Sequence, residues 1–252
     1  MLTITKHAEV HELRLTRPPV NALDPALIRA LTAAIESAPA AGARSLVLSG
    51  ATGMFSAGLD VPALLALDRA GIRAFWEDFF GVMRAIALSR VPVVCAITGH
   101  SPAGGCVLVV FSDYRVMAEG DFRIGLNEVQ VGLPVPEVIA GALTRLTGPR
   151  HAEQLLVTGA LLGPVEALAV GLVDRVVAID RVVPAAIERA QTMAALPPEA
   201  CAATRRTARA TLAASFRGVD ASLFDRMTDV WFGEETQRSM KALVERLAAR
   251  KR

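Results

Sequence analysis

The sequence predicts an α/β protein with parallel strand pairing, followed by an all-helical C-terminal third. Up to about residue 178, short apolar runs rich in β-branched residues alternate with amphipathic helical patterns, an order typical of parallel sheets covered by helices. After Asp180 only helical patterns remain. The chain has 252 residues, 52% of them hydrophobic, which is enough to bury a large core without disulfides or a metal.

Five strands are expected in the first part of the chain. Each is a short run of β-branched or large apolar residues between polar or glycine-containing turns. They span residues 8–15, 45–49, 93–98, 114–118 and 173–178.

The first helix is expected to begin at Pro25, because Asp24 is a suitable N-cap and proline is favoured at the first helical position. The apolar stripe that should cover the sheet comprises Leu27, Ile28, Leu31 and Ile35. Further helical patterns span residues 71–89, 137–146, 184–196, 199–214, 222–232 and 234–250. We therefore divide the chain into residues 1–195 and a helical region, residues 196–252, which should pack on the first region or on another subunit.

Charge and hydrophobic patterning argue against two classes of partner. The 27 basic and 25 acidic side chains give a net charge of +2, without the basic excess of a nucleic-acid-binding protein. Residues 91–112 carry no formal charge, but proline and glycine interrupt them, so a strand, a turn and a helix start are expected rather than a membrane span. Neither nucleic acid nor a membrane is an expected partner.

The cysteines and the N-terminus favour a reducing, cytoplasmic location. Cys95, Cys106 and Cys201 are odd in number and far apart, which argues against a disulfide framework and against a zinc site. The first residues show no apolar core of an export signal.

Common nucleotide, zinc and hydrolase motifs are absent or defective. The patterns GxGxxG, GxxxxGK[ST] and HExxH do not occur. The segment 99–103 approximates the GxSxG nucleophile elbow of serine hydrolases, but the residue after Ser101 is Pro102. Because proline has no N–H, it cannot supply the oxyanion-hole donor that this elbow requires. A serine hydrolase is therefore disfavoured.

Two glycine-containing turns, residues 54–60 and 102–106, carry the functional argument. If the backbone N–H groups of Leu59 and Gly104 converge on one point, they form an oxyanion hole, with the second donor at a helix start. On spacing alone, two ordinary tight turns are the more common explanation.

Several segments together resemble the crotonase superfamily, also called the enoyl-CoA hydratase/isomerase family. They are RPPVNAL at residues 17–23, FSAGLD at 55–60, PAGGC at 102–106, IGLNEVQVG at 124–132, GA at 159–160 and ALAVGLVD at 167–174. The resemblance is continuous from about residue 13 to residue 177, and beyond that the chain matches only in being helical.

The resemblance implies a spiral of ββα units in residues 1–195 that binds an acyl-CoA thioester. It also implies that the helical region 196–252 builds a homotrimer or a dimer of trimers and covers the active site. No metal or redox cofactor is expected, since coenzyme A is part of the substrate.

The same resemblance implies roles for individual residues. Leu59 and Gly104 would be the two oxyanion-hole donors. The substrate would also be contacted by Ala57, Gly58, Asp60, Val61 and Asn127, and Asn127 could instead orient the catalytic base. Basic partners for the CoA phosphates are sought at Arg14, Arg17 and residues 241–252.

The carboxylates indicate which reaction is catalysed. Family hydratases carry one Glu three residues after the oxyanion-hole glycine and a second about twenty residues further on; here these positions hold Val107 and Glu128. Hydration needs a positioned base for water as well as a proton donor, whereas a double-bond shift needs only one carboxylate. The sequence is thus most similar to the 3,2-trans-enoyl-CoA isomerase branch, with Glu128 as catalytic residue in apolar surroundings that raise its pKa.

Several alternatives remain open. The protein could be a hydratase in which another group replaces the missing Glu, a family member with a different acyl-CoA reaction such as decarboxylation or dehalogenation, or a non-catalytic acyl-CoA-binding protein. Glu128 could be a structural carboxylate paired with Arg123 or Arg115. The aromatic residues Trp76, Phe79 and Phe80 could line the acyl pocket or simply form core.

Overall fold

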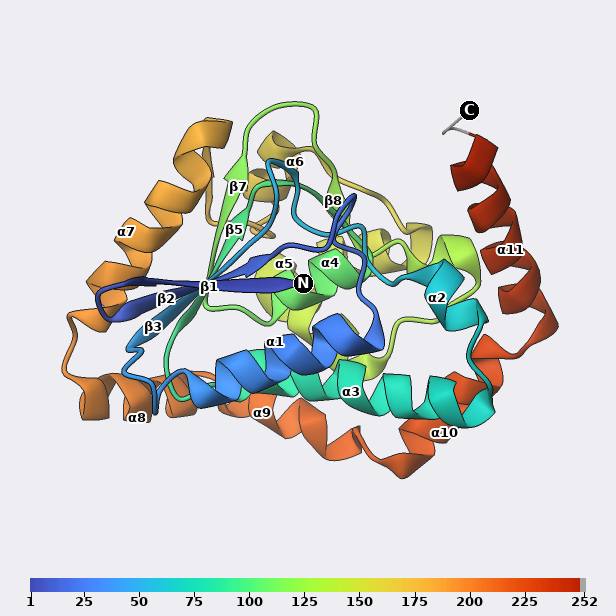
Figure 1. The fold of residues 1–252 in the computed structure, drawn as a ribbon, viewed down its shortest axis with the longest axis horizontal. Coiled ribbons are helices and arrows are strands. Elements are labelled where there is room, and N and C mark those ends of the chain that lie inside the picture. Colours follow the sequence, from blue (N-terminus) through green and yellow to red (C-terminus); the bar gives the residue numbers. More distant parts are fainter. Residues whose placement is uncertain (250–252) are drawn as a thin grey trace.

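The computed structural model describes residues 1–249 and is built on a six-stranded sheet (Figure 1). The sheet order is β1-β2-β3-β5-β7-β9, and all neighbouring pairs are parallel except β1 with β2. The strands are β1 (Leu2–His7), β2 (Val10–Leu15), β3 (Ser45–Ser49), β5 (Val93–Ile97), β7 (Tyr114–Ala118) and β9 (Arg175–Val177). The five expected strands are confirmed.

The edge strand β1 was not expected from the sequence. Its residues are mostly exposed and include Thr3, Thr5 and Lys6, so it lacks the buried apolar run used to find the other strands. It pairs with β2 through a tight turn in which Ala8 has a φ of 54°.

A second, three-stranded parallel sheet consists of β4 (Gly53–Met54), β6 (Gly99–Pro102) and β8 (Ile124–Gly125). Each of its strands follows one of the long strands β3, β5 and β7 in the chain. The fold is therefore a spiral in which one strand of each pair joins the large sheet and the next joins the small one. These strands are too short to give a periodic signal in the sequence.

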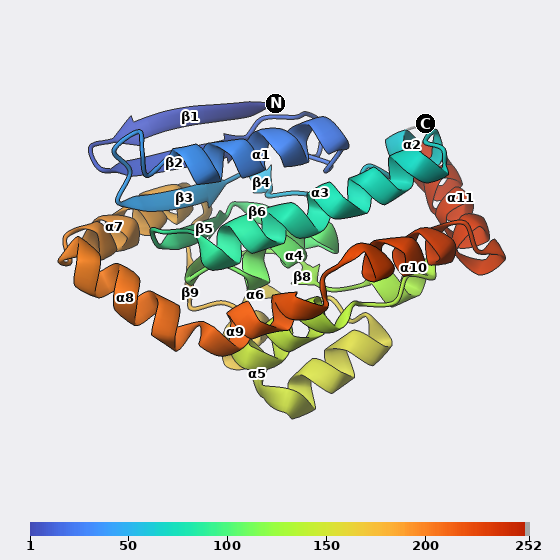
Figure 2. The same cartoon turned by 90° about the horizontal axis from the view of Figure 1, so that it is seen from below.

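Helices cover both faces of the large sheet. The helices α1 (Pro25–Ser37) and α3 (Arg69–Leu88) lie side by side on one face, and α7 (Val182–Ala194) covers the other (Figure 2). The short helix α4 (Gly104–Val110) is entirely buried. The remaining helices are α2 (Val61–Leu65), α5 (Glu137–Thr158), α6 (Pro164–Ala169), α8 (Pro198–Ala208), α9 (Ala210–Ser215), α10 (Ala221–Trp231) and α11 (Glu234–Ala249), with 3-10 turns η1 (Glu128–Val131), η2 (Ile179–Arg181) and η3 (Phe216–Gly218).

The expected start of the first helix is confirmed. Asp24 is the N-cap and its side chain accepts a hydrogen bond from the Leu27 amide at 2.8 Å, with Pro25 at the first helical position. The four residues of the apolar stripe are at most 1% exposed, and each contributes roughly 1.5–3 kcal/mol by burial.

One expected helix end is confirmed and one expected helix is divided. The first segment of α5 ends at Gly148, close to the expected end at residue 146, because Gly148 has a non-helical φ of 73° and ψ of 163°, and a second segment then continues to Thr158. The pattern at residues 199–214 divides into α8 and α9 at Arg209. No described helix combines the length and apolar character needed to cross a bilayer.

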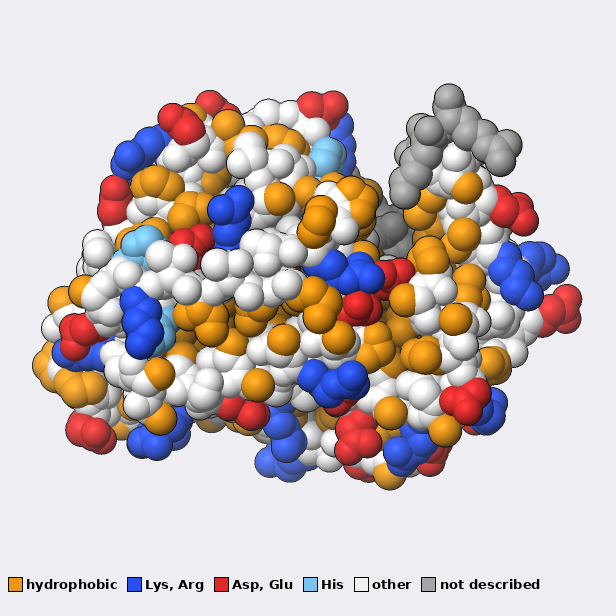
Figure 3. All heavy atoms as spheres, viewed as in Figure 1, with side chains coloured by type: hydrophobic (Ala, Val, Ile, Leu, Met, Phe, Trp, Pro, Cys, Tyr) orange, Lys and Arg blue, Asp and Glu red, His pale blue; other side chains and the backbone are white. Residues whose placement is uncertain are grey.

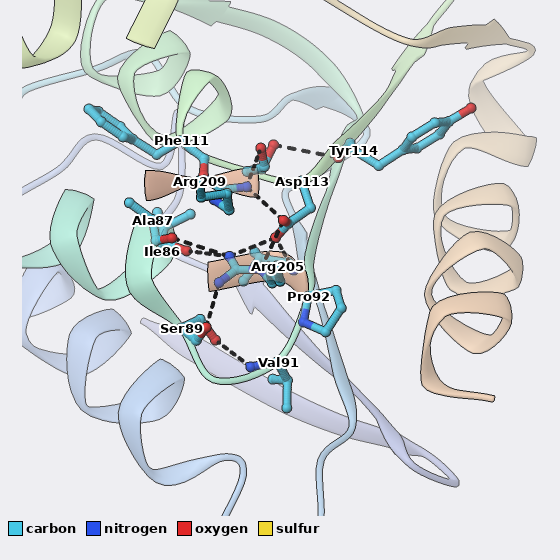
Figure 4. Close-up of polar contacts among 12 residues, drawn as sticks. Ile86, Ala87, Ser89, Val91, Pro92, Phe111, Asp113, Tyr114, Arg205 and Arg209 are labelled. Carbon is cyan, nitrogen blue, oxygen red and sulfur yellow. Dashed lines mark hydrogen bonds and ion pairs between the residues drawn. The ribbon is translucent and has the colours of Figure 1, made fainter. Parts of the chain in front are cut away.

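The helical region is attached to the α/β region by an ion cluster around Asp113 (Figure 4). The Asp113 carboxylate accepts hydrogen bonds from Arg205 at 2.9 Å and Arg209 at 2.6 Å, and from the Val93 amide at 2.8 Å. Both arginines also bind backbone carbonyls, Arg205 at the end of α3 and Arg209 at the end of α4. The cluster therefore ties α8 and α9 to the segment that follows α4.

The aromatic residues of α3 form core. Trp76, Phe79 and Phe80 are at most 4% exposed, and Trp76 packs edge-on against Trp231 of α10 with ring centroids 6.1 Å apart. Packing between α3 and α10 is thus a sufficient reason for these side chains.

Candidate active site

The first glycine-containing turn is held by a buried network around Asn21. The Asn21 amide group donates to the Phe55 carbonyl at 3.1 Å, and its own backbone carbonyl accepts from the Ser56 hydroxyl at 2.8 Å. The same hydroxyl oxygen accepts from the Gly58 amide at 3.2 Å. Because all of these groups are buried, the network fixes the course of the chain up to Leu59.

Both carboxylate oxygens of Asp60, the residue after Leu59, are bonded to other groups of the protein. One carboxylate oxygen caps α2 by accepting from the Ala63 amide at 3.1 Å, and the other pairs with Arg17 at 2.5 Å. Arg17 also pairs with Asp24 at 3.0 Å. The charge of Arg17 is therefore matched by two aspartates, whereas Arg14 is exposed on β2.

The second turn leads directly into α4. Ala103 precedes it with φ 47° and ψ −125°, a conformation that a non-glycine residue adopts only under tertiary constraint. The constraint includes a hydrogen bond from the Ala103 amide to the Gly125 carbonyl at 2.8 Å. Gly104 follows as the first residue of the helix.

The two turns meet at their glycines. A Cβ on Gly58 would lie 3.0 Å from the Gly104 amide nitrogen, and a Cβ on Gly104 would lie 3.3 Å from Leu59 Cδ2. Neither the Leu59 N–H nor the Gly104 N–H has an acceptor within residues 1–249. Two amide donors without an acceptor in the described part of the chain therefore lie on adjoining turns.

Glu128 opens the 3-10 turn η1, and its carboxyl group is largely removed from water. Oε2 is buried and has no hydrogen-bond partner among the described residues. Burial raises the pKa of this carboxyl to about 7. Such a group changes its protonation near neutral pH, as a general acid–base catalyst requires.

The structural alternative for Glu128 is not found in the described chain. Arg123 pairs with Asp121 at 2.8 Å and Arg115 pairs with Asp174 at 2.7 Å. Both arginines that sequence reasoning offered as partners are thus engaged elsewhere.

The Glu128 segment is joined to the Gly104 turn through β6 and β8. Gly125 lies opposite Pro102 in the small sheet. Cys106, on α4, has a thiol whose pKa is raised by burial and further by the negative charge of Glu128, while a hydrogen bond from the Gly125 backbone N–H acts in the opposite direction. The segment that leads to Glu128 is therefore paired with the segment that leads into α4.

The other expected site residues lie on the chain segments that carry these groups or next to them. Val107 is fully buried on α4, so an apolar side chain occupies the position of the first hydratase glutamate. Asn127 has a buried Oδ1 without a partner among residues 1–249. Ala57 is half-buried and its amide donates to the Val20 carbonyl at 3.0 Å, and Val61 is the first residue of α2.

Sequence reasoning did not single out Asn21 or Gly125, although both lie in the motifs it used. A signal for Asn21 is that asparagine tolerates positive φ, and here its φ is 50°. Ser101, of the hydrolase-like segment, has a buried hydroxyl with no hydrogen-bond partner in the described part of the chain. A surface pocket of about 370 Å³ lies elsewhere, between α7, α8 and Asp113.

The paired strands and meeting glycine turns define a crotonase-type fold. A crystal structure of human mitochondrial delta3-delta2-enoyl-CoA isomerase matches it with a TM-score of 0.94 and 30% sequence identity, covering 100% of this chain and 99% of the human chain. A model described as enoyl-CoA hydratase/isomerase matches residues 5–250. The chain belongs to the enoyl-CoA hydratase/isomerase family and is an enzyme of that family.

Relatives carry both activities in their names. Mouse enoyl-CoA delta isomerase 1, mitochondrial, is 37% identical over 178 residues, which cover 69% of this chain and 62% of the mouse protein, less than two thirds of its length. A probable enoyl-CoA hydratase of Rhizobium meliloti is 32% identical over 222 residues, covering 86% of this chain and 85% of that protein.

Proposed function

We propose that this protein is an acyl-CoA isomerase that moves the double bond of a 3-enoyl-CoA to position 2. The observation that carries the proposal is the single carboxyl of Glu128, whose Oε2 is buried and has no hydrogen-bond partner among the described residues, together with Val107 at the position where a hydratase has a second glutamate. The similarity to proteins named enoyl-CoA isomerases supports it.

The proposed mechanism is a proton shuttle. The Glu128 carboxylate removes a proton from C2, and the electrons of that C–H bond delocalise into the thioester carbonyl to form a dienolate. The protonated Glu128 then delivers the proton to C4, so that the C3=C4 double bond is replaced by C2=C3. No atom is gained or lost, and one carboxyl serves both steps.

The dienolate oxygen is stabilised by the amides of Leu59 and Gly104. Each donor in such an oxyanion hole contributes on the order of 3 kcal/mol to transition-state stabilisation. The absence of an acceptor for either N–H within residues 1–249 supports this assignment. Asn127 next to the base either orients the carboxyl or contacts the thioester, and Ala57, Gly58, Asp60 and Val61 form the adjoining substrate-binding turn.

The division of the chain is also part of the proposal. Residues 1–195 bind the acyl-CoA, and residues 196–252 cover the site and assemble a homotrimer or a dimer of trimers; residues 250–252, the end of the basic segment 241–252, lie outside the described residues. Apart from Arg205, the side chains of α8 are exposed or half-buried in the single chain, which supports a subunit contact there. We propose a reducing, cytoplasmic location, supported by the three free cysteines.

A spectrophotometric assay separates the candidate reactions. With purified protein, a 3-enoyl-CoA should gain the ultraviolet absorbance of a conjugated enoyl thioester. Loss of that absorbance from a 2-enoyl-CoA would instead indicate hydration, the second candidate, which the hydratase-named relative favours. Binding of an acyl-CoA without any change to it would indicate a non-catalytic binding protein.

A further inference from the structure

The 3-10 turn that carries Glu128 is short and depends on its ends. It spans only Glu128–Val131 and closes at Gly132, whose φ of 72° is left-handed. The Glu128 carbonyl accepts hydrogen bonds from the Gly132 amide and from the Leu133 amide, the latter at 3.1 Å. Because a single 3-10 turn has little stability of its own, a displacement of Gly132 moves Glu128.

The first turn of α11 is hydrogen-bonded to Gly132, the residue that closes the 3-10 turn. The Thr236 hydroxyl donates to the Gly132 carbonyl at 2.6 Å, and Thr236 is 3% exposed. A Cβ on Gly132 would lie 3.2 Å from Thr236 Cα. The backbones of the two segments are thus in direct contact, and the hydroxyl satisfies a carbonyl that the turn leaves open.

The opposite side of the turn is held by the end of α5. The Gln130 side-chain amide donates to the Gly159 carbonyl at 2.9 Å, and a Cβ on Gly159 would lie 2.9 Å from Val129 Cγ1. The turn is therefore fixed from two sides, and α11 is the side that comes from the C-terminal helical region.

We propose that Thr236 is a positioning residue that sets the place of the Glu128 carboxyl through its hydrogen bond to the Gly132 carbonyl. This inference rests on the proposed role of Glu128 as the catalytic base. Without the hydroxyl, the Gly132 carbonyl has to find water as its partner, and the turn shifts relative to α4 and the two amides. The Glu128 carboxyl then becomes more exposed to water and is no longer held in one orientation.

The test compares Thr236→Val, which keeps the shape of the side chain but removes the hydroxyl, with Thr236→Ser, which keeps the hydroxyl. We expect Thr236→Val to lower kcat for a 3-enoyl-CoA by about 10-fold to 100-fold, as small misplacements of catalytic groups do, with KM changed by less than about twofold. Thr236→Ser should restore most of the rate. Thr228→Val is the matched control, because Thr228 is also 3% exposed and bonds only within α10.

A second readout does not need turnover. In protein labelled at the glutamate carboxyl carbons, nuclear magnetic resonance would follow the titration of Glu128, with Glu128→Gln to identify its signal. In Thr236→Val the Glu128 pKa should fall from about 7 towards the ordinary 4.5, and in Thr228→Val it should not move. If Thr236→Val fails to fold, Thr236→Ala carries the same expectation.

The outcomes separate this inference from the proposed function. A wild-type kcat together with an unchanged Glu128 titration in the variant lacking the hydroxyl would overturn the positioning role. An equal loss in Thr236→Ser and Thr236→Val would also overturn it, because the hydroxyl would then not be the cause. A wild-type protein that isomerises no 3-enoyl-CoA, but whose Glu128 titration responds to Thr236→Val, would refute the proposed function and retain the positioning role.

Discussion

Gly58 and Gly104 approach each other so closely that a Cβ on Gly58 would lie 3.0 Å from the Gly104 amide nitrogen. Gly58 also has a φ of +86°, a region that L side chains rarely adopt. The approach brings together the turns that carry the amides of Leu59 and Gly104. The spacing of these two amides therefore depends on the absence of a side chain at residue 58.

Gly58→Ala should lower kcat by about 10²-fold or more, because separating the turns removes an oxyanion-hole donor from its place. Gly42→Ala is the matched control, since Gly42 has a φ of +93° with no atom within 4 Å of its would-be Cβ. It shares the backbone strain but not the crowding. Steady-state kinetics and thermal denaturation of both variants check the prediction, and equal losses of activity would contradict it.

Much of the fold could be predicted from periodicity and capping. The strand at residues 45–49 is a continuous buried run, and α1 starts where Asp24 and Pro25 indicate. The strands of the small sheet could not be predicted in this way, because segments of two to four residues show no period. Their pairing depends on the spiral course of the whole chain rather than on local preference.

The candidate reacting groups of the site could be predicted from the sequence, but the contacts that hold them in place could not. Glycine-containing turns and a lone glutamate are visible in a sequence, so Leu59, Gly104 and Glu128 could be singled out. The contact of Thr236 with Gly132 joins positions far apart in the chain, and no local pattern reports such an approach.

The activity should depend on pH through Glu128. Burial raises the pKa of this carboxyl to about 7, and only the ionised form can remove a proton from C2. The value of kcat/KM should therefore rise about tenfold per pH unit below about pH 7 and level off above it. A profile that is flat from about pH 5 to pH 8 would show that another group is the base.

Glu128→Gln should abolish that rise and lower kcat by about 10³-fold or more, because an amide cannot accept the proton. Acyl-CoA binding should persist, since the two amides and the substrate turn are unchanged. Steady-state assays with a 3-enoyl-CoA measure kcat. Equilibrium titration with a non-isomerisable acyl-CoA measures binding. Full activity of the variant would exclude the proton shuttle.

The same residue should make stability depend on pH. The Glu128 pKa is raised from 4.5 to about 7 in the folded protein, so the folded state binds the proton more tightly than the unfolded state. The associated stability is fully present below pH 4.5 and is lost as the pH rises through about 7. Relative to Glu128→Gln, the wild type should lose on the order of 3 kcal/mol across this window.

Urea denaturation of the wild type and Glu128→Gln at several pH values measures this difference. Other titrating groups are common to both proteins and cancel in the comparison. If the difference in unfolding free energy stays constant with pH, then the carboxyl is solvated in the folded protein, and its use as a base near neutral pH loses its physical basis.

Asp113 should be the carboxylate on which attachment of the helical region most depends. Arg205 and Arg209 both bind it, and burial lowers the pKa of Arg209 to about 10, so this guanidinium remains charged at neutral pH. Asp113→Asn leaves two buried cations without a counter-charge and should cost about 3–5 kcal/mol of unfolding free energy. Asp121→Asn, which removes an exposed partner of Arg123, should cost less than about 1 kcal/mol.

A double variant separates the cost of an unpaired Arg209 charge from the contribution of the Arg209 hydrogen bonds to backbone carbonyls. The double variant with Asp113→Asn and Arg209→Met removes one of the two unpaired buried cations. It should recover part of the unfolding free energy lost in Asp113→Asn, because burying an apolar side chain of similar length costs less than burying an unpaired guanidinium. Denaturation midpoints of the single and double variants measure this. If the double variant is less stable than Asp113→Asn alone, the bonds of Arg209 to the carbonyls of Phe111 and Ser112 contribute more than its pairing with Asp113.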